Sequence, residues 1–338
     1  MPTVFLDGRF VPASDACVSA FDAGFQHGVG LFETMLAVRD GARVVHLHEH
    51  LERLRRSART LGLSDSLRVG ALAEAVRRTV DRAFQDDERS ARLRVRLTIT
   101  GGDLNLLSRG ETRAEHLPTL LLAAQPATDY PAEMFESGVL ATLADLRVNP
   151  LDDTQGHKTL NYWGRLRELQ AAAAKRAGES LVFSITNHLA GGCVSNAFVV
   201  HAGELWTPIA RGEEEDVASQ GDESAVAPAD PDVGPPDEPA HAGAGPGAQR
   251  GAVIPSPVLP GVVRRWVMDW ALAEGRTVRR RMISLDDVLR ADELLLTNSS
   301  WGVLPVTRFE SRPIGTGEVG ELGTRLAAAW RDLIAAGG

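Results

Sequence analysis

Residues 154–170 read TQGHKTLNYWGRLRELQ and contain Lys158, one of only two lysines among 338 residues. The other is Lys175, and all remaining members of the 36 lysines and arginines are arginines. Arginine keeps its proton in proteins, whereas a desolvated lysine amine can lose its proton and attack a carbonyl. Lys158 is therefore a candidate for covalent chemistry, with chance retention of both lysines on helix surfaces as the alternative.

Outward from this stretch, strands and helices alternate. Asp7-Gly8 and Asp40-Gly41 stand between β-favouring runs and predict two hairpins. Residues 47–61 repeat leucine at helical spacing before Gly62, which predicts an amphipathic helix. Further helices are expected over 66–84, 160–178, 259–275 and the C-terminal end. Further strands are expected over 92–100, 119–125, 138–148, 180–186, 196–208 and 293–306.

This mixture indicates an α/β (α+β) fold with two domains. A chain of this length with 43% hydrophobic residues can bury one or two cores. Prolines at 126 and 131 mark the expected joint. We expect a smaller N-terminal α/β domain over 1–125 and a larger C-terminal domain over 126–338 that carries Lys158.

The formal charge of −9 is concentrated in one segment. Residues 211–251 hold ten acids, two arginines and six prolines, but no aromatic residue, leucine, isoleucine or methionine. Such a composition buries too little apolar area to offset the entropy of ordering the chain. We therefore predict a disordered insertion over 211–251 within the second domain. An acidic segment on a nearly neutral remainder argues against nucleic acid as a partner.

Other features bear on location and metals. The sequence has no signal-peptide pattern and no apolar run long enough to cross a bilayer, so we expect a cytoplasmic protein with no membrane partner. Cys17 and Cys193 are too few for a disulfide framework, and both are predicted to be buried in a reducing compartment. His46, His48 and His50 are interpreted as the polar start of a helix, and no metal is expected.

Two segments have features that suit a phosphate group. Pro260 and Gly261 precede a predicted helix, so the backbone N–H groups of Val262 and Val263 fall at its electropositive end. The run Thr297–Ser300 offers small polar side chains after an apolar strand, where α/β folds present ligand-binding groups. Together with a reactive lysine, these features suggest pyridoxal phosphate as cofactor.

Several motifs occur in a recognisable order: DAGFQHGVGLFETM (22–35), EHLERLRRSARTLGL (49–63), KTLNY (158–162), VSNAFVV (194–200), LPGVVRR (259–265) and ADELLLTNSSWGVLPV (291–306). This series resembles the fold type IV pyridoxal-phosphate enzymes. That family includes branched-chain aminotransferases, D-amino-acid aminotransferases and aminodeoxychorismate lyase. The resemblance covers nearly the whole chain outside the acidic insertion.

The resemblance implies roles for particular residues. Lys158 is similar to the lysine that forms the internal aldimine with pyridoxal phosphate and moves the substrate α-proton. Arg53 is similar to the arginine that holds the cofactor phosphate, and a guanidinium suits a dianion. The backbone of Val262 and Val263 completes the phosphate cup. The side chains of Ser299 and Asn298 contribute to the same cup. Tyr162 is the candidate partner of the cofactor's ring oxygen, with a core position as the alternative.

The sequence departs from the family at one position. Members carry a glutamate five residues before the asparagine of VSNAF, where it keeps the pyridine nitrogen protonated so that the ring accepts electrons. In this chain that position is Gly191. A side chain there is expected to point toward the ring nitrogen, so its loss favours a neutral ring, which is a poorer electron sink.

Three functions follow from the resemblance. The first is an aminotransferase acting on a small amino acid and a 2-oxo acid, with a compromised electron sink or a carboxylate supplied from elsewhere. The second is a lyase of the aminodeoxychorismate type, which GLFETM and TNSSWGVLPV resemble. The third is a catalytically lapsed protein that keeps the fold for binding or regulation. The family also implies a homodimer.

Overall fold

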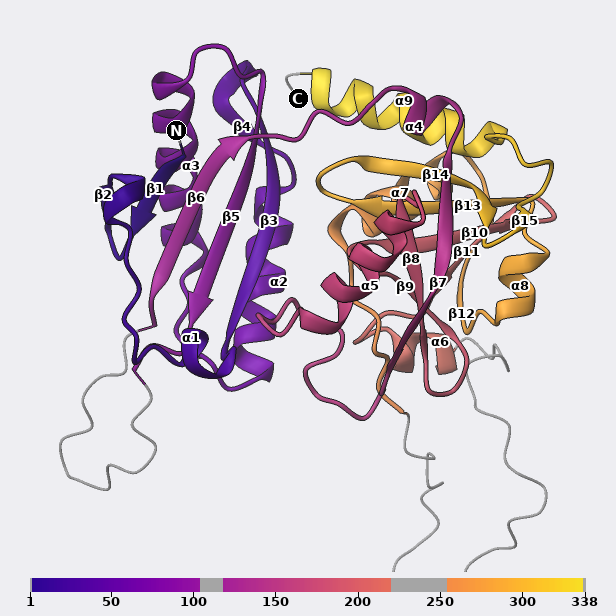
Figure 1. Cartoon of the computed structure of the whole chain (residues 1–338), viewed down its shortest axis with the longest axis horizontal. Coiled ribbons are helices and arrows are strands. Elements are labelled where there is room, and N and C mark those ends of the chain that lie inside the picture. The colour runs from indigo at the N-terminus through magenta and orange to yellow at the C-terminus, as the bar shows by residue number, and fades with distance from the viewer. Residues whose placement is uncertain (1, 104–117, 220–253, 337–338) are drawn as a thin grey trace, which may run out of the picture.

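The computed structural model describes residues 2–103, 118–219 and 254–336. Two β-sheets with helices packed on them make up these residues (Figure 1). The first sheet is antiparallel, with the order β2-β1-β6-β5-β3-β4. Its strands are β1 (Thr3–Leu6), β2 (Arg9–Val11), β3 (Gly30–Val38), β4 (Arg43–Val44), β5 (Arg92–Thr100) and β6 (Leu120–Pro126).

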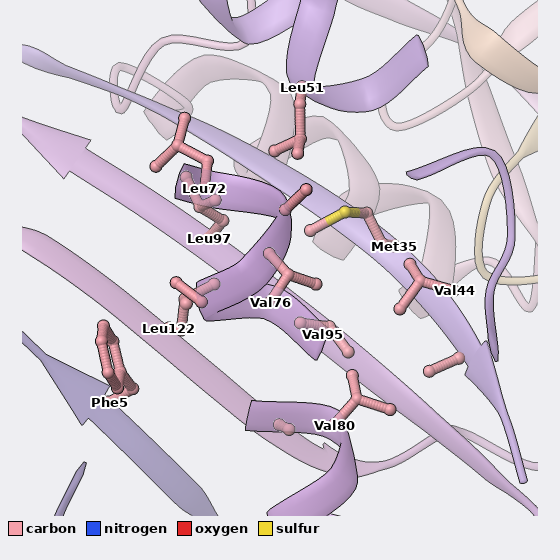
Figure 2. Close-up of a cluster of buried hydrophobic side chains, with 14 of the residues drawn as sticks. Phe5, Met35, Val44, Leu51, Leu72, Val76, Val80, Val95, Leu97 and Leu122 are labelled. Atoms are coloured by element: carbon pink, nitrogen blue, oxygen red, sulfur yellow. The ribbon is translucent and has the colours of Figure 1, made fainter. Parts of the chain in front are cut away.

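Helices cover one face of this sheet, and the other face is directed toward the second half of the molecule. Alternate residues of β3 and β5 pack with α2 and α3 in one hydrophobic cluster. Figure 2 shows Leu51 and Val76 from the helices near Met35 and Val95 from the strands. The helical segments of this half are η1 (Ala13–Asp15), α1 (Ala23–His27), η2 (Asp40–Ala42), α2 (Leu47–Thr60) and α3 (Val69–Asp86).

The second sheet mixes parallel and antiparallel pairs in the order β12-β11-β10-β13-β14-β7-β8-β9, with β15 paired to β14. The pairs β11–β12, β14–β7 and β7–β8 are parallel. Its strands are β7 (Val139–Val148), β8 (Glu179–Ser184), β9 (Leu189–Gly192), β10 (Asn196–His201), β11 (Glu204–Pro208), β12 (Val278–Arg281), β13 (Glu293–Asn298), β14 (Gly302–Phe309) and β15 (Arg312–Pro313).

Helices of the second half connect and cover these strands. They are α4 (Glu133–Glu136), α5 (Trp163–Ala174), α6 (Glu214–Ser219), α7 (Val262–Ala273), α8 (Leu285–Leu289) and α9 (Glu321–Ala335). No helix in the described part of the chain is long and apolar enough to cross a membrane.

The two halves are joined by apolar packing and by hydrogen bonds that include those of Arg43. Leu36 and Val38 of β3 share a hydrophobic cluster with Val263 of α7 and Trp330 of α9. Arg43 of β4 donates hydrogen bonds to carbonyl oxygens at the end of α9. These contacts place the face of the first sheet that is not covered by α2 and α3 beside the start of α7.

The predicted α/β (α+β) class is confirmed, and several details differ. Residues 293–306 form two strands, β13 and β14, because the polar run after Asn298 turns the chain back on itself. The helix predicted over 160–178 begins only at Trp163, where Tyr162 is its N-cap. Cys193 is buried as predicted, but Cys17 is exposed.

The predicted start of the insertion at residue 211 is wrong. Glu213 accepts hydrogen bonds of 2.8 Å from both terminal nitrogens of the buried Arg264 side chain. Glu214 accepts a hydrogen bond from the backbone of Ser256, and the following residues form α6. An acid-rich composition concealed these contacts because their partners lie about fifty residues away in the sequence. The rest of the predicted insertion, 220–251, lies outside the described residues.

We expect Glu213→Gln to lower the free energy of unfolding by about 3 kcal/mol, because it leaves the Arg264 guanidinium buried without its counter-charge. Chemical denaturation followed by circular dichroism measures this change. Glu215→Gln, on the exposed side of α6, is the matched control and should change stability by less than about 0.5 kcal/mol. Equal effects of the two substitutions would contradict a structural role for the Glu213–Arg264 pair.

Candidate functional site

A cavity of about 570 Å³ lies where the face of the first sheet that is not covered by α2 and α3 meets the second half. Phe32 and Thr34 of β3 line one wall, and β5 contributes Arg94 and Arg96. The opposite walls come from the loop before α5, the end of β9, the start of α7 and the turn after β13. Among the described residues, the wall includes no aspartate or glutamate, whereas it includes five cationic side chains: Arg53, Arg94, Arg96, Lys158 and Arg165. This cavity is suited to an anionic ligand.

Lys158 is held in this cavity by backbone pairing with β3. Its carbonyl oxygen accepts a hydrogen bond of 2.9 Å from the Phe32 N–H, and the Leu160 N–H donates to the Gly30 carbonyl at 3.0 Å. The Lys158 Nζ lies 4.6 Å from the centre of the Phe32 ring. The loop therefore presents the amine at a fixed place beside an aromatic face.

Arg53 projects from α2 into a buried ion pair. Its Nε and Nη2 donate to the two carboxylate oxygens of Glu33 at 2.8 and 2.6 Å, and its Nη1 donates to the Pro260 carbonyl. Burial alone raises the pKa of Glu33, but Arg53 and His50 outweigh burial and lower it to about 2. The carboxylate is therefore ionised, and it fixes the guanidinium beside the start of α7.

His50 connects the same carboxylate to Ser299. Its Nδ1 lies 2.8 Å from Glu33 Oε2, and its Nε2 lies 3.2 Å from Ser299 Oγ. Burial lowers the pKa of His50, so the imidazole is neutral near pH 7. A neutral ring that donates from Nδ1 to Glu33 leaves Nε2 as the acceptor for the Ser299 hydroxyl.

The start of α7 supplies backbone donors. Gly261 is the N-cap without a side-chain cap, so the first N–H groups of the helix, those of Val262 and Val263, have no intrahelical acceptor. Asn196 approaches Gly261 closely and donates from Nδ2 to the Leu259 carbonyl at 2.8 Å. A Cβ at residue 261 would collide with that side chain, which explains the glycine.

Asn298 and Tyr162 also line the cavity, in different ways. The Asn298 Oδ1 accepts hydrogen bonds from the Ser300 and Trp301 N–H groups, and its Nδ2 donates to the Val194 carbonyl. This side chain therefore shapes the turn that presents Ser299. Tyr162 packs edge-on against Phe32, with ring centres 5.2 Å apart.

His157 and Trp301 are polar groups at the cavity that were not found from the sequence, whereas Thr297 belongs to the polar run that the sequence indicated. His157 Nε2, Thr297 Oγ1 and Trp301 Nε1 are buried and have no hydrogen-bond partner among the described residues. Burial lowers the pKa of His157 to about 4, with Arg211 adding to the effect, so this ring is neutral near pH 7. Buried polar atoms normally have a partner, so their position suits a polar ligand.

Position 191 has little room for a side chain. Gly191 has φ +121°, and a Cβ built on it would lie 2.7 Å from the Ser195 carbonyl oxygen. A side chain at residue 191 therefore lacks the open path toward the ring nitrogen that the sequence led us to expect, because the loop after β9 folds back over this residue.

We expect Gly191→Ala to lower the free energy of unfolding by about 1–3 kcal/mol, since an L-residue is strained at this φ and its Cβ meets backbone. Gly70→Ala is the control, because nothing lies within 4 Å of a Cβ at this position in α3. The control should be neutral or stabilising by up to about 1 kcal/mol. Urea unfolding of both variants measures the difference, and a neutral Gly191→Ala would show that the backbone here relaxes freely.

Comparison with known proteins places this geometry in a family. The family model described as amino-transferase class IV matches residues 30–213 and 251–309. The chain belongs to the class IV aminotransferases. The match omits 214–250, which lie entirely within the predicted insertion. The predicted resemblance to fold type IV enzymes is therefore confirmed.

Relatives of this class IV aminotransferase match over nearly its full length. A putative branched-chain-amino-acid aminotransferase of Methanocaldococcus jannaschii is 28% identical over 332 residues, covering 98% of this chain and 96% of that protein. A D-alanine aminotransferase of Staphylococcus epidermidis is 25% identical, covering 99% and 98% of the two chains.

Two solved structures share the fold of this class IV aminotransferase. The branched-chain amino acid aminotransferase of Escherichia coli has a TM-score of 0.76 at 21% identity, with 98% and 94% of the chains covered. The 4-amino-4-deoxychorismate lyase of Pseudomonas aeruginosa has a TM-score of 0.72 at 24% identity, with 97% and 98% covered.

The cofactor of class IV aminotransferases is pyridoxal phosphate. The cavity fits this group, because an anion cup at the start of α7 and an amine beside an aromatic face occur together in one space. The unpaired Thr297 hydroxyl and His157 imidazole nitrogen supply further polar partners.

Proposed function

We propose that this chain is a pyridoxal-phosphate-dependent aminotransferase that moves an amino group between a small amino acid and a 2-oxo acid. Lys158 carries the cofactor, and Gly191 stands where the family has a glutamate. The observation that carries the proposal is the place of Lys158, the one lysine among the described residues of the cavity wall, in the same space as the anion cup.

The residues of the cup have distinct tasks in this proposal. The Val262 and Val263 N–H groups donate to the phosphate, the Ser299 side chain completes the cup, and Arg53 adds a charge that Glu33 holds in place. Tyr162, which lines the same cavity, would be the partner of the cofactor's ring oxygen. When bound, pyridoxal phosphate supplies an electron sink that makes the substrate α-proton removable. Lys158 Nζ would take that proton from the substrate α-carbon and move it to the cofactor.

The substrate side of the cavity is also cationic. Arg94 and Arg96 lie on the same face of β5, and neither forms a hydrogen bond or ion pair that involves another described residue. The Arg96 guanidinium lies 3.9 Å from the centre of the Phe32 ring, which fixes its plane. These two groups suit the carboxylate shared by an amino acid and a 2-oxo acid.

We further propose a cytoplasmic homodimer with no nucleic-acid or membrane partner, and domains divided as 1–125 and 126–338. The division follows the two sheets, since β6 ends the first at Pro126 and β7 begins the second at Val139. Exposed apolar side chains such as Phe25 (75% exposed) and Trp163 (80%) support a subunit interface. Light scattering on purified protein gives the subunit number.

The function is tested by following products. The protein, loaded with pyridoxal phosphate, is incubated with a panel of L- and D-amino acids and a 2-oxo acid, and NMR detects the new amino acid. Amino transfer supports the proposal. Release of pyruvate from aminodeoxychorismate without an amino acceptor would instead assign the lyase activity. Cofactor binding without either product would favour the third function, a protein that has lost catalysis and keeps the fold for binding or regulation.

A further inference from the structure

The wall of the cavity at the end of β9 has a cation where a carboxylate is expected. In the proposed function, on which this inference rests, residue 191 is where the family places the partner of the cofactor's ring nitrogen. Gly191 has no side chain, and the Ser195 carbonyl occupies the direction of its Cβ. The nitrogen's partner must therefore come from another part of the chain.

Glu179, a buried acid beside Gly192, is already fully engaged. Its Oε1 accepts hydrogen bonds from the Ser180 and Cys193 N–H groups, and its Oε2 accepts from the Val194 N–H and the Ser195 hydroxyl. Glu179 also shares a strand face with Leu181, which belongs to the core and not to the cavity. This carboxylate holds the loop after β9 and does not line the cavity.

Arg165 reaches the same strand end from α5. It lies in the first turn of α5, three residues after Tyr162, which puts both side chains on one face of the helix. Its Nη1 donates to the Gly192 carbonyl at 3.0 Å and lies 3.4 Å from the Cys193 carbonyl. The guanidinium is therefore anchored beside residue 191, at the cavity wall.

The remaining donors of Arg165 are available. Among the described residues, no carboxylate forms an ion pair with it, and its Nε and Nη2 make no hydrogen bond. A guanidinium only donates, so it can pair with a ring nitrogen that keeps its lone pair but not with one that already carries a proton.

We propose that Arg165 takes the place of the glutamate and donates a hydrogen bond to the unprotonated ring nitrogen of pyridoxal phosphate. The cofactor is then held as a neutral pyridine, in a cavity whose described wall has no carboxylate to stabilise a pyridinium. A neutral ring withdraws electrons less strongly, so this arrangement slows steps that need a delocalised carbanion.

The protonation state of the ring nitrogen tests this proposal without reference to turnover. The protein is loaded with pyridoxal phosphate labelled with ¹⁵N in the ring, and the nitrogen resonance of the bound cofactor is recorded near neutral pH. A pyridine-type shift is expected for the wild type, and a pyridinium-type shift for Arg165→Glu. A pyridinium-type shift in the wild type would overturn the proposal while leaving amino transfer intact. A failure to bind labelled cofactor at all would overturn the proposed function as well.

Cofactor affinity provides a second measurement. Arg165→Leu removes the donor and should raise the dissociation constant of pyridoxal phosphate by about tenfold, the effect of one hydrogen bond that involves a charged group. Arg165→Lys keeps a donor and should restore much of the loss. Arg167→Leu is the control, because this exposed arginine of α5 pairs with Glu168 and is outside the cavity wall. Unchanged affinity and an unchanged resonance in Arg165→Leu would show that Arg165 only ties α5 to β9.

Discussion

Lys158→Ala should abolish the adduct that borohydride fixes between the protein and pyridoxal phosphate, and should lower amino transfer by several powers of ten. The reason is chemical. Arginine cannot replace a neutral amine as nucleophile, and Lys158 is the one lysine among the described residues of the cavity wall. The mass of the reduced protein reports the adduct directly, and the loss of its absorbance gives an independent reading.

The second lysine of the chain provides a strict control. Lys175 is the C-cap residue of α5 and does not line the cavity. Lys175→Ala should therefore keep the adduct and the activity. Because no third lysine exists, an adduct that persists in Lys158→Ala and disappears in Lys175→Ala would reverse the assignment. An adduct on both variants would mean that more than one group of the chain can form it, and would overturn the assignment to Lys158 alone.

The sequence was sufficient to predict those site residues whose signals lie close to them in the chain. The scarcity of lysine drew attention to Lys158, and Pro260-Gly261 marked the start of α7. Both signals lie within a few residues of the group that they indicate. The strand β9 was missed because Leu189–Gly192 contains two glycines and has little β propensity of its own. It forms through pairing with β8.

Partners distant in the sequence could not be found in the same way. Arg53 faces Glu33 because α2 packs on the side of β3 that carries Glu33 and Met35. Which residues lie on that side depends on the register of the first sheet. From the sequence alone, Arg165 could equally well be a solvent-exposed charge on the polar face of α5. Only the approach of β9 brings it to the Gly192 carbonyl.

Glu33→Gln should lower the free energy of unfolding by about 3–5 kcal/mol, because it leaves the Arg53 guanidinium buried without a counter-charge. Glu33 is 1% exposed and binds two side chains of α2, so an amide of the same size cannot satisfy both. Glu52→Gln, on the same helix, is the control. Its partly exposed pair with Arg55 should contribute no more than about 1 kcal/mol.

The pH dependence of stability separates charge from packing in this prediction. The pKa of Glu33 falls from an ordinary value of 4.5 to about 2 in the folded protein, so the unfolded chain binds the proton more tightly. The contribution of Glu33 is therefore fully present above about pH 4.5 and is lost as the pH falls toward 2. Urea unfolding between pH 7 and pH 3 should show wild type and Glu33→Gln converging as the solution becomes acidic. A constant difference across that range would mean that the loss comes from packing, and the ionised carboxylate would not be what holds Arg53 beside α7.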